Sequence, residues 1–229
     1  MDRTVIVTGA AGALAKAVIE AFLAQGAEVL ALDHKPDRLA AAWGATPRVR
    51  TLAVDLTDAG ATEVALTAAL AGSGQLVLCN LAGGFDMGPP LHQTDDALWR
   101  RMMDLNVATL INTCRAVVPA MQAAASGKIV NVASAAATSG KAGMGAYCAA
   151  KDAVARLTES MAAELRHQGI NVNAVAPTVL DTLANRAAMP DADPSKWVAL
   201  SELAAVIEFL ASPGASAVHG AVLPVSGLS

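Results

Sequence analysis

A tyrosine and a lysine stand four residues apart, at Tyr147 and Lys151, and Ser134 precedes the tyrosine by thirteen residues. Residues four apart in a helix share a face, so the ammonium would lie beside the phenol and lower its pKa towards neutral pH. Such a phenol can serve as a general acid/base. Ser134 would donate a hydrogen bond to a substrate oxygen, and the side-chain amide of Asn106 would hold a water near Lys151. We therefore predict proton transfer at a substrate oxygen, with no metal.

These residues need a scaffold, and the sequence indicates one by its periodicity. Short aliphatic runs alternate with longer segments in which apolar residues recur at three- and four-residue spacing. The predicted strands are 4–8, 28–33, 50–55, 76–80, 128–133, 171–176 and 221–225. The predicted helices include 14–23, 59–70, 105–121, 149–165 and 200–210. Alternation of this kind, with nearly all-apolar strands, predicts a parallel sheet covered on both faces. We expect an α/β fold, a Rossmann-type doubly wound sheet of about seven strands, as a single domain over residues 1–229.

The turn after the first strand is made of small residues, Thr8-Gly9-Ala10-Ala11-Gly12-Ala13-Leu14. Small residues between a strand and a helix N-terminus let backbone N–H groups approach a pyrophosphate, and the helix dipole favours its negative charge. The candidate contacts in this turn are Gly9, Gly12, Ala13 and Leu14. The sequence thus predicts a dinucleotide site, although a tight turn in an alanine-rich protein would look similar.

Polar and small residues follow the next predicted strands. Asp33 ends the second strand, where a carboxylate can accept both ribose hydroxyls of an adenosine and repel a 2′-phosphate. We therefore expect NAD(H) to be preferred over NADP(H), although basic Lys35 and Arg38 follow closely. The further candidates at the carboxyl edge of the sheet are Asp55, Leu56, Asn80, Ala82 and Gly83.

Together these elements resemble the classical short-chain dehydrogenase/reductase family over essentially the whole chain. The matching residues are Thr8-Gly9, Asp33, Asp55, Asn80-x-Ala82-Gly83, Asn106, Ser134, Tyr147-x-x-x-Lys151 and the segment from Asn173 through Pro177 to Thr182. The resemblance implies that Asn106, Ser134, Tyr147 and Lys151 form a catalytic tetrad. It also implies that Tyr147, Lys151 and Pro177 lie at the cofactor, with Lys151 on the nicotinamide ribose and Val179 and Thr182 near the carboxamide.

The chain departs from the family pattern at four positions. Ala13 and Ala15 stand where the second and third glycines of the nucleotide turn are usual. Leu81 replaces an asparagine, and Thr178 replaces a glycine after Pro177. Alanine is the smallest possible change from glycine, so we expect cofactor binding to survive.

The longest stretch without clear periodicity runs from 177 to 196, and we expect 177–198 to be the substrate-binding loop. Its Leu180-Asp181-Thr182 start, its Asn185-Arg186 pair and Trp197 resemble dihydropteridine reductases, which reduce quinonoid dihydropterins with NADH. Those enzymes lack the serine and asparagine of the tetrad, and this chain keeps both. The predicted wall of the substrate pocket comprises Phe85, Met87, Met144, Leu180, Leu183, Met189 and Trp197.

Composition excludes several other classes of protein. The chain has 229 residues, 54% of them hydrophobic, and a net charge of −4. Mild acidity without basic clusters argues against nucleic acid or anionic membranes as partners, and no apolar run is long enough for a membrane span. The three cysteines form no CxxC pair, and no signal peptide is visible, so we expect a cytoplasmic protein with free thiols. By resemblance, we expect a homodimer or homotetramer formed through segments 105–121 and 149–165.

The leading functional hypothesis is an NAD(H)-dependent oxidoreductase that interconverts a ketone or other carbonyl and a secondary alcohol. A pterin reductase of the dihydropteridine reductase kind is the first alternative. An alternative from another class is a regulator that binds nicotinamide cofactors without turnover, but such a protein would gain nothing from an intact Tyr–Lys pair. A further alternative is an alanine-rich scaffold subunit, which would not need polar residues at the strand ends.

Overall fold

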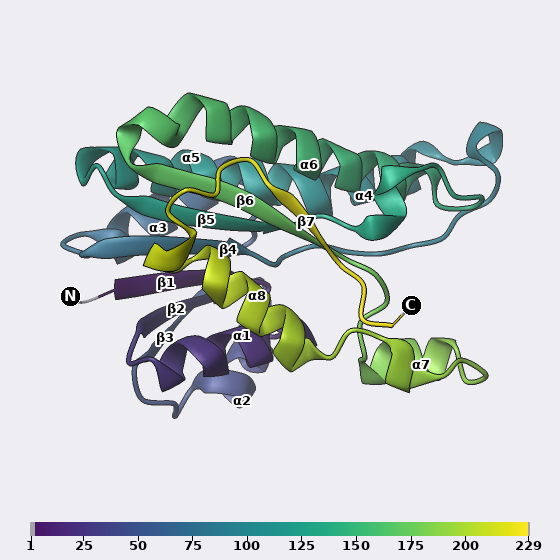
Figure 1. Ribbon diagram of the computed structural model, residues 1–229, viewed down its shortest axis with the longest axis horizontal. Helices are drawn as coiled ribbons and strands as arrows, with labels where there is room; N and C mark the ends of the chain where they lie inside the picture. The colour runs from purple at the N-terminus through teal and green to yellow at the C-terminus, as the bar shows by residue number, and fades with distance from the viewer. Residues whose placement is uncertain (1–2, 229) are drawn as a thin grey trace.

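In the computed structural model, which describes residues 3–228, a seven-stranded sheet forms the centre of the molecule (Figure 1). All neighbouring strands are parallel, in the order β3-β2-β1-β4-β5-β6-β7. The strands are β1 Arg3–Thr8, β2 Glu28–Asp33, β3 Val49–Ala53, β4 Gln75–Asn80, β5 Gly127–Val132, β6 Ile170–Pro177 and β7 Val222–Val225. The predicted doubly wound parallel sheet is therefore confirmed, with strand ends that differ from the predicted ones by no more than two residues.

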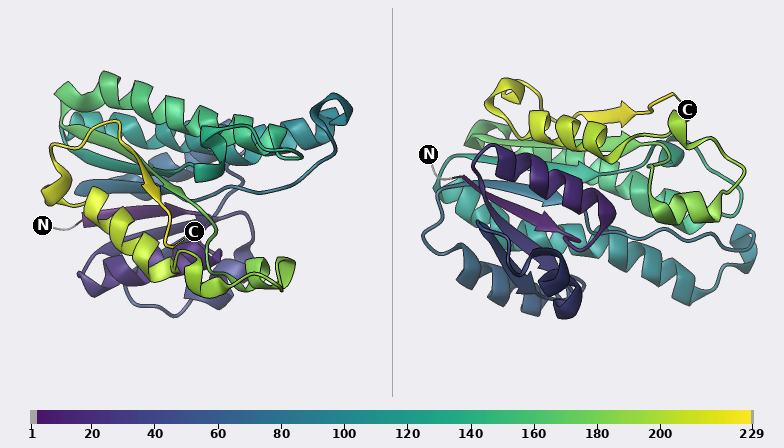
Figure 2. Two further views of the ribbon diagram at one scale, coloured as in Figure 1. Left: turned by 45° about the vertical axis from the view of Figure 1, so that its right-hand side comes forward. Right: turned by 90° about the horizontal axis from the view of Figure 1, so that it is seen from below.

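Helices cover both faces of this sheet (Figure 2). One face packs against α3 (Ala59–Leu70), α5 (Thr109–Ala123) and α6 (Gly145–Leu165). The other packs against α1 (Ala13–Ala24), α2 (Pro36–Trp43) and α8 (Leu200–Leu210). Successive strand residues point to opposite faces, so Ile6 enters the first core while Val5 enters the second. Coverage on both faces explains the continuous apolar runs inside the strands, such as Val5–Val7, Val29–Leu32 and Leu76–Cys79.

Three helices were not among those predicted from apolar periodicity. Helix α2 begins with Pro36, whose fixed φ suits a first helical turn, and buries Leu39 and Trp43 on one face. Helix α7 (Leu183–Ala188) lies inside the stretch that showed no periodicity. Helix α4 (Asp96–Met103) continues through a π-helical turn, Asp104–Ala108, into α5, so the predicted 105–121 helix is the second half of a longer one.

The start of α4 also corrects a prediction. Thr94 directly precedes the acidic residues Asp95 and Asp96, a pattern that predicts Thr94 as the N-cap, but the N-cap is Asp95, whose carboxylate accepts the backbone N–H of Leu98 at 2.7 Å. An ionised cap also interacts favourably with the helix dipole, and Asp96 adds a second negative charge in the first turn.

Candidate active site

The candidate site lies along the carboxyl edge of the sheet, around the junction of β1 and β4. Crossovers leave these neighbouring strands in opposite directions, since β2 lies on one side of the pair and β5 on the other. In open α/β sheets the crevice at such a switch point binds ligands. The loops after β1, β2, β4 and β5 bring the predicted residues to this edge.

The nucleotide turn has the geometry that a close backbone approach needs. Gly9 adopts φ +65°, and a Cβ there would lie 3.0 Å from the Cα of Ala82. Gly12 is the N-cap of α1 and has no side chain to cap it, which leaves N–H groups of the first turn available to a ligand. Ala13 is exposed beside them, whereas the methyl of Ala15 is buried in the core between α1 and the sheet. The two alanines therefore add their methyl groups in quite different places.

Thr8 fastens this turn to the loop after β4, a role that the sequence did not reveal. Its hydroxyl oxygen accepts the backbone N–H groups of Leu81 and Ala82, each at 2.9 Å. Thr8 is itself almost fully buried. The sequence shows a threonine at the end of β1, but it does not indicate this role, because the residues that donate to Thr8 lie more than seventy residues away.

Replacing Thr8 with valine is expected to destabilise the protein by about 2 kcal/mol, because two N–H donors lose their acceptor while side-chain shape is kept. Urea unfolding measures this loss. The Thr8→Ser variant retains the hydroxyl and should recover most of it, and equal stability of the valine variant and the wild type would contradict the assigned role.

Asp33 lies almost buried at the end of β2. One carboxylate oxygen accepts the backbone N–H of Ala11 at 3.1 Å, and the other lies 3.1 Å from Nδ1 of His34. Arg38 donates to the carbonyl of Ala11 at 3.1 Å, so a guanidinium stands close to the same turn. The negative charge of Asp33 would repel a 2′-phosphate, whereas the positive charge of Arg38 would attract it.

A cavity of about 450 Å³ extends from this carboxylate past the nucleotide turn to the loop after β4. Its lining includes Gly9, Gly12, Asp33, Asp55, Leu56, Ala82 and Gly83, all of which were predicted to bind the cofactor. The pKa of Asp55 is lowered, chiefly because the Thr57 hydroxyl donates to its carboxylate. Ala13, Leu14, Asn80, Pro177, Val179 and Thr182 are not among the lining residues.

Asn80 instead belongs to a buried network that joins two neighbouring strands to two helices. Its amide donates to the side chain of Asn131 at 2.9 Å and its carbonyl accepts the Thr113 hydroxyl at 2.8 Å. Asn131 in turn donates to Thr158 of α6 at 2.9 Å. These hydrogen bonds link β4, β5, α5 and α6.

Tyr147 and Ser134 meet at the N-terminal end of α6. Ser134 follows β5 and caps a short 3-10 helix, accepting the backbone N–H of Ala136 at 3.2 Å. Its hydroxyl also lies close enough to that of Tyr147 to act on the pKa of the phenol. The ring of Phe85 lies edge-on to the Tyr147 ring, with centroids 4.9 Å apart. The two hydroxyls that were predicted to hold a substrate oxygen are therefore adjacent.

The pKa of Tyr147 differs from the expectation. Lys151 was expected to lower it, but burial raises the pKa of the phenol, and the nearby Ser134 side chain only partly opposes this. Lys151 itself is buried, which lowers the pKa of its ammonium to about 8, and its Nζ donates to the carbonyl of Val132 at 2.8 Å. Desolvation thus dominates both groups in the protein without ligands.

Asn106 lies in the π-helical turn and also differs from the expectation. Its amide was expected to hold a water near Lys151, but the side chain is occupied by protein groups. It accepts the N–H of Gly84 at 3.2 Å and donates to the carbonyls of Gly84 at 3.0 Å and Met102 at 2.9 Å. A Cβ on Gly83 would lie 2.7 Å from its Oδ1 and 3.3 Å from Nζ of Lys151, so glycine keeps these two side chains close.

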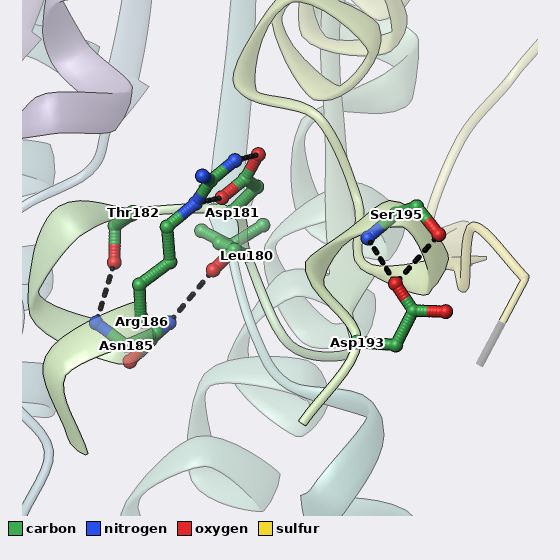
Figure 3. Close-up of polar contacts among 7 residues, drawn as sticks. All are labelled: Leu180, Asp181, Thr182, Asn185, Arg186, Asp193 and Ser195. Carbon is green, nitrogen blue, oxygen red and sulfur yellow. Dashed lines mark hydrogen bonds and ion pairs between the residues drawn. The ribbon is translucent and has the colours of Figure 1, made fainter. Parts of the chain in front are cut away.

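The segment after β6 is an ordered structure held by its own polar contacts (Figure 3). Arg186 forms two hydrogen bonds to the carboxylate of Asp181, at 2.6 and 2.7 Å. Thr182 caps α7 by accepting the N–H of Asn185 at 3.1 Å, and Asn185 donates to the carbonyl of Leu180 at 2.8 Å. Asp193 accepts two hydrogen bonds from Ser195, which lower the pKa of its carboxyl.

The predicted pocket residues have very different exposures. Leu183 is 87% exposed on the first turn of α7, whereas Trp197 is buried. Leu180 forms a β-bridge to Val198 and packs against the core beside α1 and α8. Phe85, which contacts Tyr147, is 60% exposed, and Met144 is the N-cap of α6. The structure brings Phe85 to the reactive residues and leaves Leu183 on the outer surface.

Comparison with known proteins agrees with this architecture. The model of the short chain dehydrogenase family matches residues 3–193. Cis-4-hydroxycyclohexanecarboxylate dehydrogenase from Sinomonas cyclohexanicum is 37% identical, over 99% of this chain and 96% of its own length. Galactitol 2-dehydrogenase (L-tagatose-forming) from Cereibacter sphaeroides is 36% identical, over 96% of this chain and 92% of its own.

Solved structures show the same fold. A short-chain type dehydrogenase/reductase from Mycobacterium ulcerans superimposes with a TM-score of 0.92 at 30% identity, covering 100% of this chain and 90% of its own. A gluconate 5-dehydrogenase from Burkholderia cenocepacia, in complex with NADP and tartrate, superimposes with a TM-score of 0.91 at 26% identity, covering 99% of this chain and 95% of its own. The parallel sheet, the glycine turn and these similarities define a dinucleotide-dependent oxidoreductase. The chain belongs to the short-chain dehydrogenase family, whose members act on alcohols and carbonyls with NAD(P).

The residues present fit such a cofactor. The bare backbone at Gly9 and Gly83, the uncapped start of α1 and the buried carboxylate of Asp33 border one continuous cavity. None of the helices between residues 3 and 228 is both long and apolar enough to cross a membrane.

Proposed function

We propose that the chain is an NAD(H)-dependent oxidoreductase that interconverts a ketone and a secondary alcohol, acting as one domain with 177–198 as its substrate-binding loop. The observation that carries this proposal is the closeness of the Ser134 and Tyr147 hydroxyls, with the buried ammonium of Lys151 one helical turn after Tyr147 on α6 and on the same cavity as Ser134. Two hydroxyl groups that meet at one point suit a single carbonyl oxygen.

In this mechanism Ser134 and Tyr147 hydrogen-bond the substrate oxygen, and Tyr147 transfers the proton. The raised pKa of Tyr147 keeps the phenol protonated at neutral pH, which suits a general acid in ketone reduction. Lys151 holds the cofactor ribose and supplies a positive charge at the site. The nicotinamide, when bound, supplies or accepts the hydride. Asn106 positions the loop at Gly83 and Gly84 through its side-chain hydrogen bonds.

Cofactor preference follows from Asp33 in this proposal. Its carboxylate would accept the hydroxyls of the adenosine ribose and repel a 2′-phosphate, so NAD(H) is favoured over NADP(H). The opposing influence is Arg38, which lines the same cavity. The NADP in the gluconate 5-dehydrogenase structure is a reason to measure this preference directly.

The Asp33→Asn variant is expected to narrow or invert the preference, with the NADH:NADPH ratio of kcat/KM falling about tenfold. The physical reason is loss of a like charge, which is worth about 1–4 kcal/mol near a surface, while the amide oxygen can still accept the N–H of Ala11. Steady-state kinetics with both cofactors measure the ratio. Arg38→Ala should change the ratio in the opposite direction, and an unchanged ratio in Asp33→Asn would exclude Asp33 as the ribose ligand.

A substrate panel tests the proposed reaction. We expect oxidation of NADH with simple ketones or β-keto esters, and a large loss of that activity in Ser134→Ala. Activity on quinonoid dihydropterin alone, unchanged in Ser134→Ala, would support a pterin reductase instead. Tight NADH binding without turnover of any panel member would support a regulator.

We also propose assembly into a homodimer or homotetramer through the outer faces of α5 and α6. The support is the family resemblance and the small residues on α6, such as Ala149 and Ala153, which permit close helix packing. Sedimentation velocity measures the oligomeric state.

A further inference from the structure

The side chain of Phe85 lies in an unusual place for a large apolar group. It is 60% exposed, yet its ring contacts the only tyrosine of the chain, with the two ring planes at 84°. Met87, two residues further on, is 59% exposed. Exposed apolar side chains gathered at a polar reactive centre suggest a surface that a ligand covers.

Gly84 and Asn106 hold Phe85 from its N-terminal side. Asn106 bonds both the N–H and the carbonyl of Gly84, the residue directly before Phe85. A Cβ on Gly84 would lie 2.9 Å from Cδ1 of Leu105. The backbone that carries Phe85 is thus fixed against the π-helical turn.

The C-terminal side is held equally well. Asp86 forms an ion pair with Arg101 of α4. Gly88 donates its N–H to the carbonyl of Gly143 at 2.8 Å, just before α6 begins. The methyl group of Met87 lies 3.5 Å from the Cβ position of Gly143, so this side chain reaches the loop that precedes Tyr147. Phe85 and Met87 are therefore presented on a backbone that is fixed at both ends.

We infer that Phe85 and Met87 form an apolar platform beside the Ser134–Tyr147 pair, which selects ketones and secondary alcohols that carry an apolar ring over polyhydroxylated ones. This inference rests on the proposed function. A flat apolar ring replaces water on the exposed part of Phe85, whereas the hydroxyls of a polyol would lose hydrogen bonds to water there without replacement. The known relatives include enzymes named for both kinds of substrate, a hydroxycyclohexane carboxylate and galactitol.

Reduction of cyclohexanone and of dihydroxyacetone by NADH, measured with the full chain, tests this inference. The wild type should favour cyclohexanone in kcat/KM. In Phe85→Ala the preference should fall at least about tenfold, through a higher KM for cyclohexanone, because loss of apolar contact in a pocket changes discrimination by this order. Phe85→Leu keeps an apolar side chain, so its preference for cyclohexanone should lie between those of the wild type and Phe85→Ala.

Phe209→Ala is the matched control, since Phe209 is a half-exposed phenylalanine on α8 that contributes to neither the pocket nor the tetrad; it should leave both substrates unchanged. An active wild type whose preference survives in both Phe85 variants would overturn the platform and leave the proposed function intact. Equal losses on both substrates would also overturn it, because Phe85 would then serve only to orient Tyr147. No turnover of any ketone by the wild type would overturn both proposals.

Discussion

Replacing Tyr147 with phenylalanine is expected to lower kcat for ketone reduction by about 10³-fold or more, since general acid catalysis contributes about 10²–10⁴-fold. The hydroxyl is the only part of the side chain that is lost. The ring remains packed against Phe85, so the local structure should persist. The dissociation constant for NADH, measured by fluorescence titration, should change less than about threefold.

Ser134→Ala provides the comparison. It removes a hydrogen-bond donor to the substrate oxygen but leaves the acid in place, so its loss in kcat should be smaller, about 10²-fold. Circular dichroism and thermal unfolding check that both variants fold. Near-normal turnover by Tyr147→Phe would remove the tyrosine from the proposed role.

The second large effect concerns Lys151 and pH. Burial disfavours the ammonium and lowers its pKa to about 8, so the charged form predominates below this pH and the neutral amine above it. If the ammonium is the required form, kcat/KM for ketone reduction is constant at neutral pH and falls about tenfold per unit above pH 8. Tyr147 does not cause this fall, because burial raises its pKa above the usual 10. A pH–rate profile in the reducing direction measures it.

Two variants of Lys151 make the assignment specific. Lys151→Met should lower kcat/KM by about 10²-fold at pH 7, because it removes the charge that the mechanism requires. Lys151→Arg keeps a cation that does not titrate in this range. Whatever activity it retains should show no decline near pH 8. A decline that persists in the arginine variant would assign the titration to another group.

Periodicity predicted the sheet well because its five inner strands, β2, β1, β4, β5 and β6, are buried along nearly their whole length. Runs such as Val5–Val7 are apolar throughout, and their boundaries coincide with glycines and polar residues. Helix α2 was missed although Leu39 and Trp43 stand four apart, because a segment of eight residues gives only two apolar positions on one face. Trp43 also donates to the carbonyl of Ala10 at 2.8 Å, which ties α2 to the nucleotide turn.

Side chains that are close in sequence could be grouped from the sequence, as with Tyr147 and Lys151, because both lie on one helix, α6. Contacts between distant segments could not be predicted in this way. No spacing rule connects Thr8 to Leu81, or Phe85 to Tyr147. The predicted direction of the Tyr147 pKa shift was wrong for a related reason. The spacing of Tyr147 and Lys151 indicates a charge interaction between them, but the burial that raises the pKa depends on the whole fold. The likeness of the 177–198 loop to dihydropteridine reductases stays a prediction.

The presence of one tyrosine makes this protein well suited to direct spectroscopy. Ionisation of a phenol changes its ultraviolet absorption, and tryptophan does not ionise in the accessible range. A difference titration of the intact protein therefore reports on Tyr147 alone, without isotopic labelling, and Tyr147→Phe supplies the blank. Repeated with NAD bound, the same titration would record how far a ligand shifts this single proton equilibrium, separately from any rate.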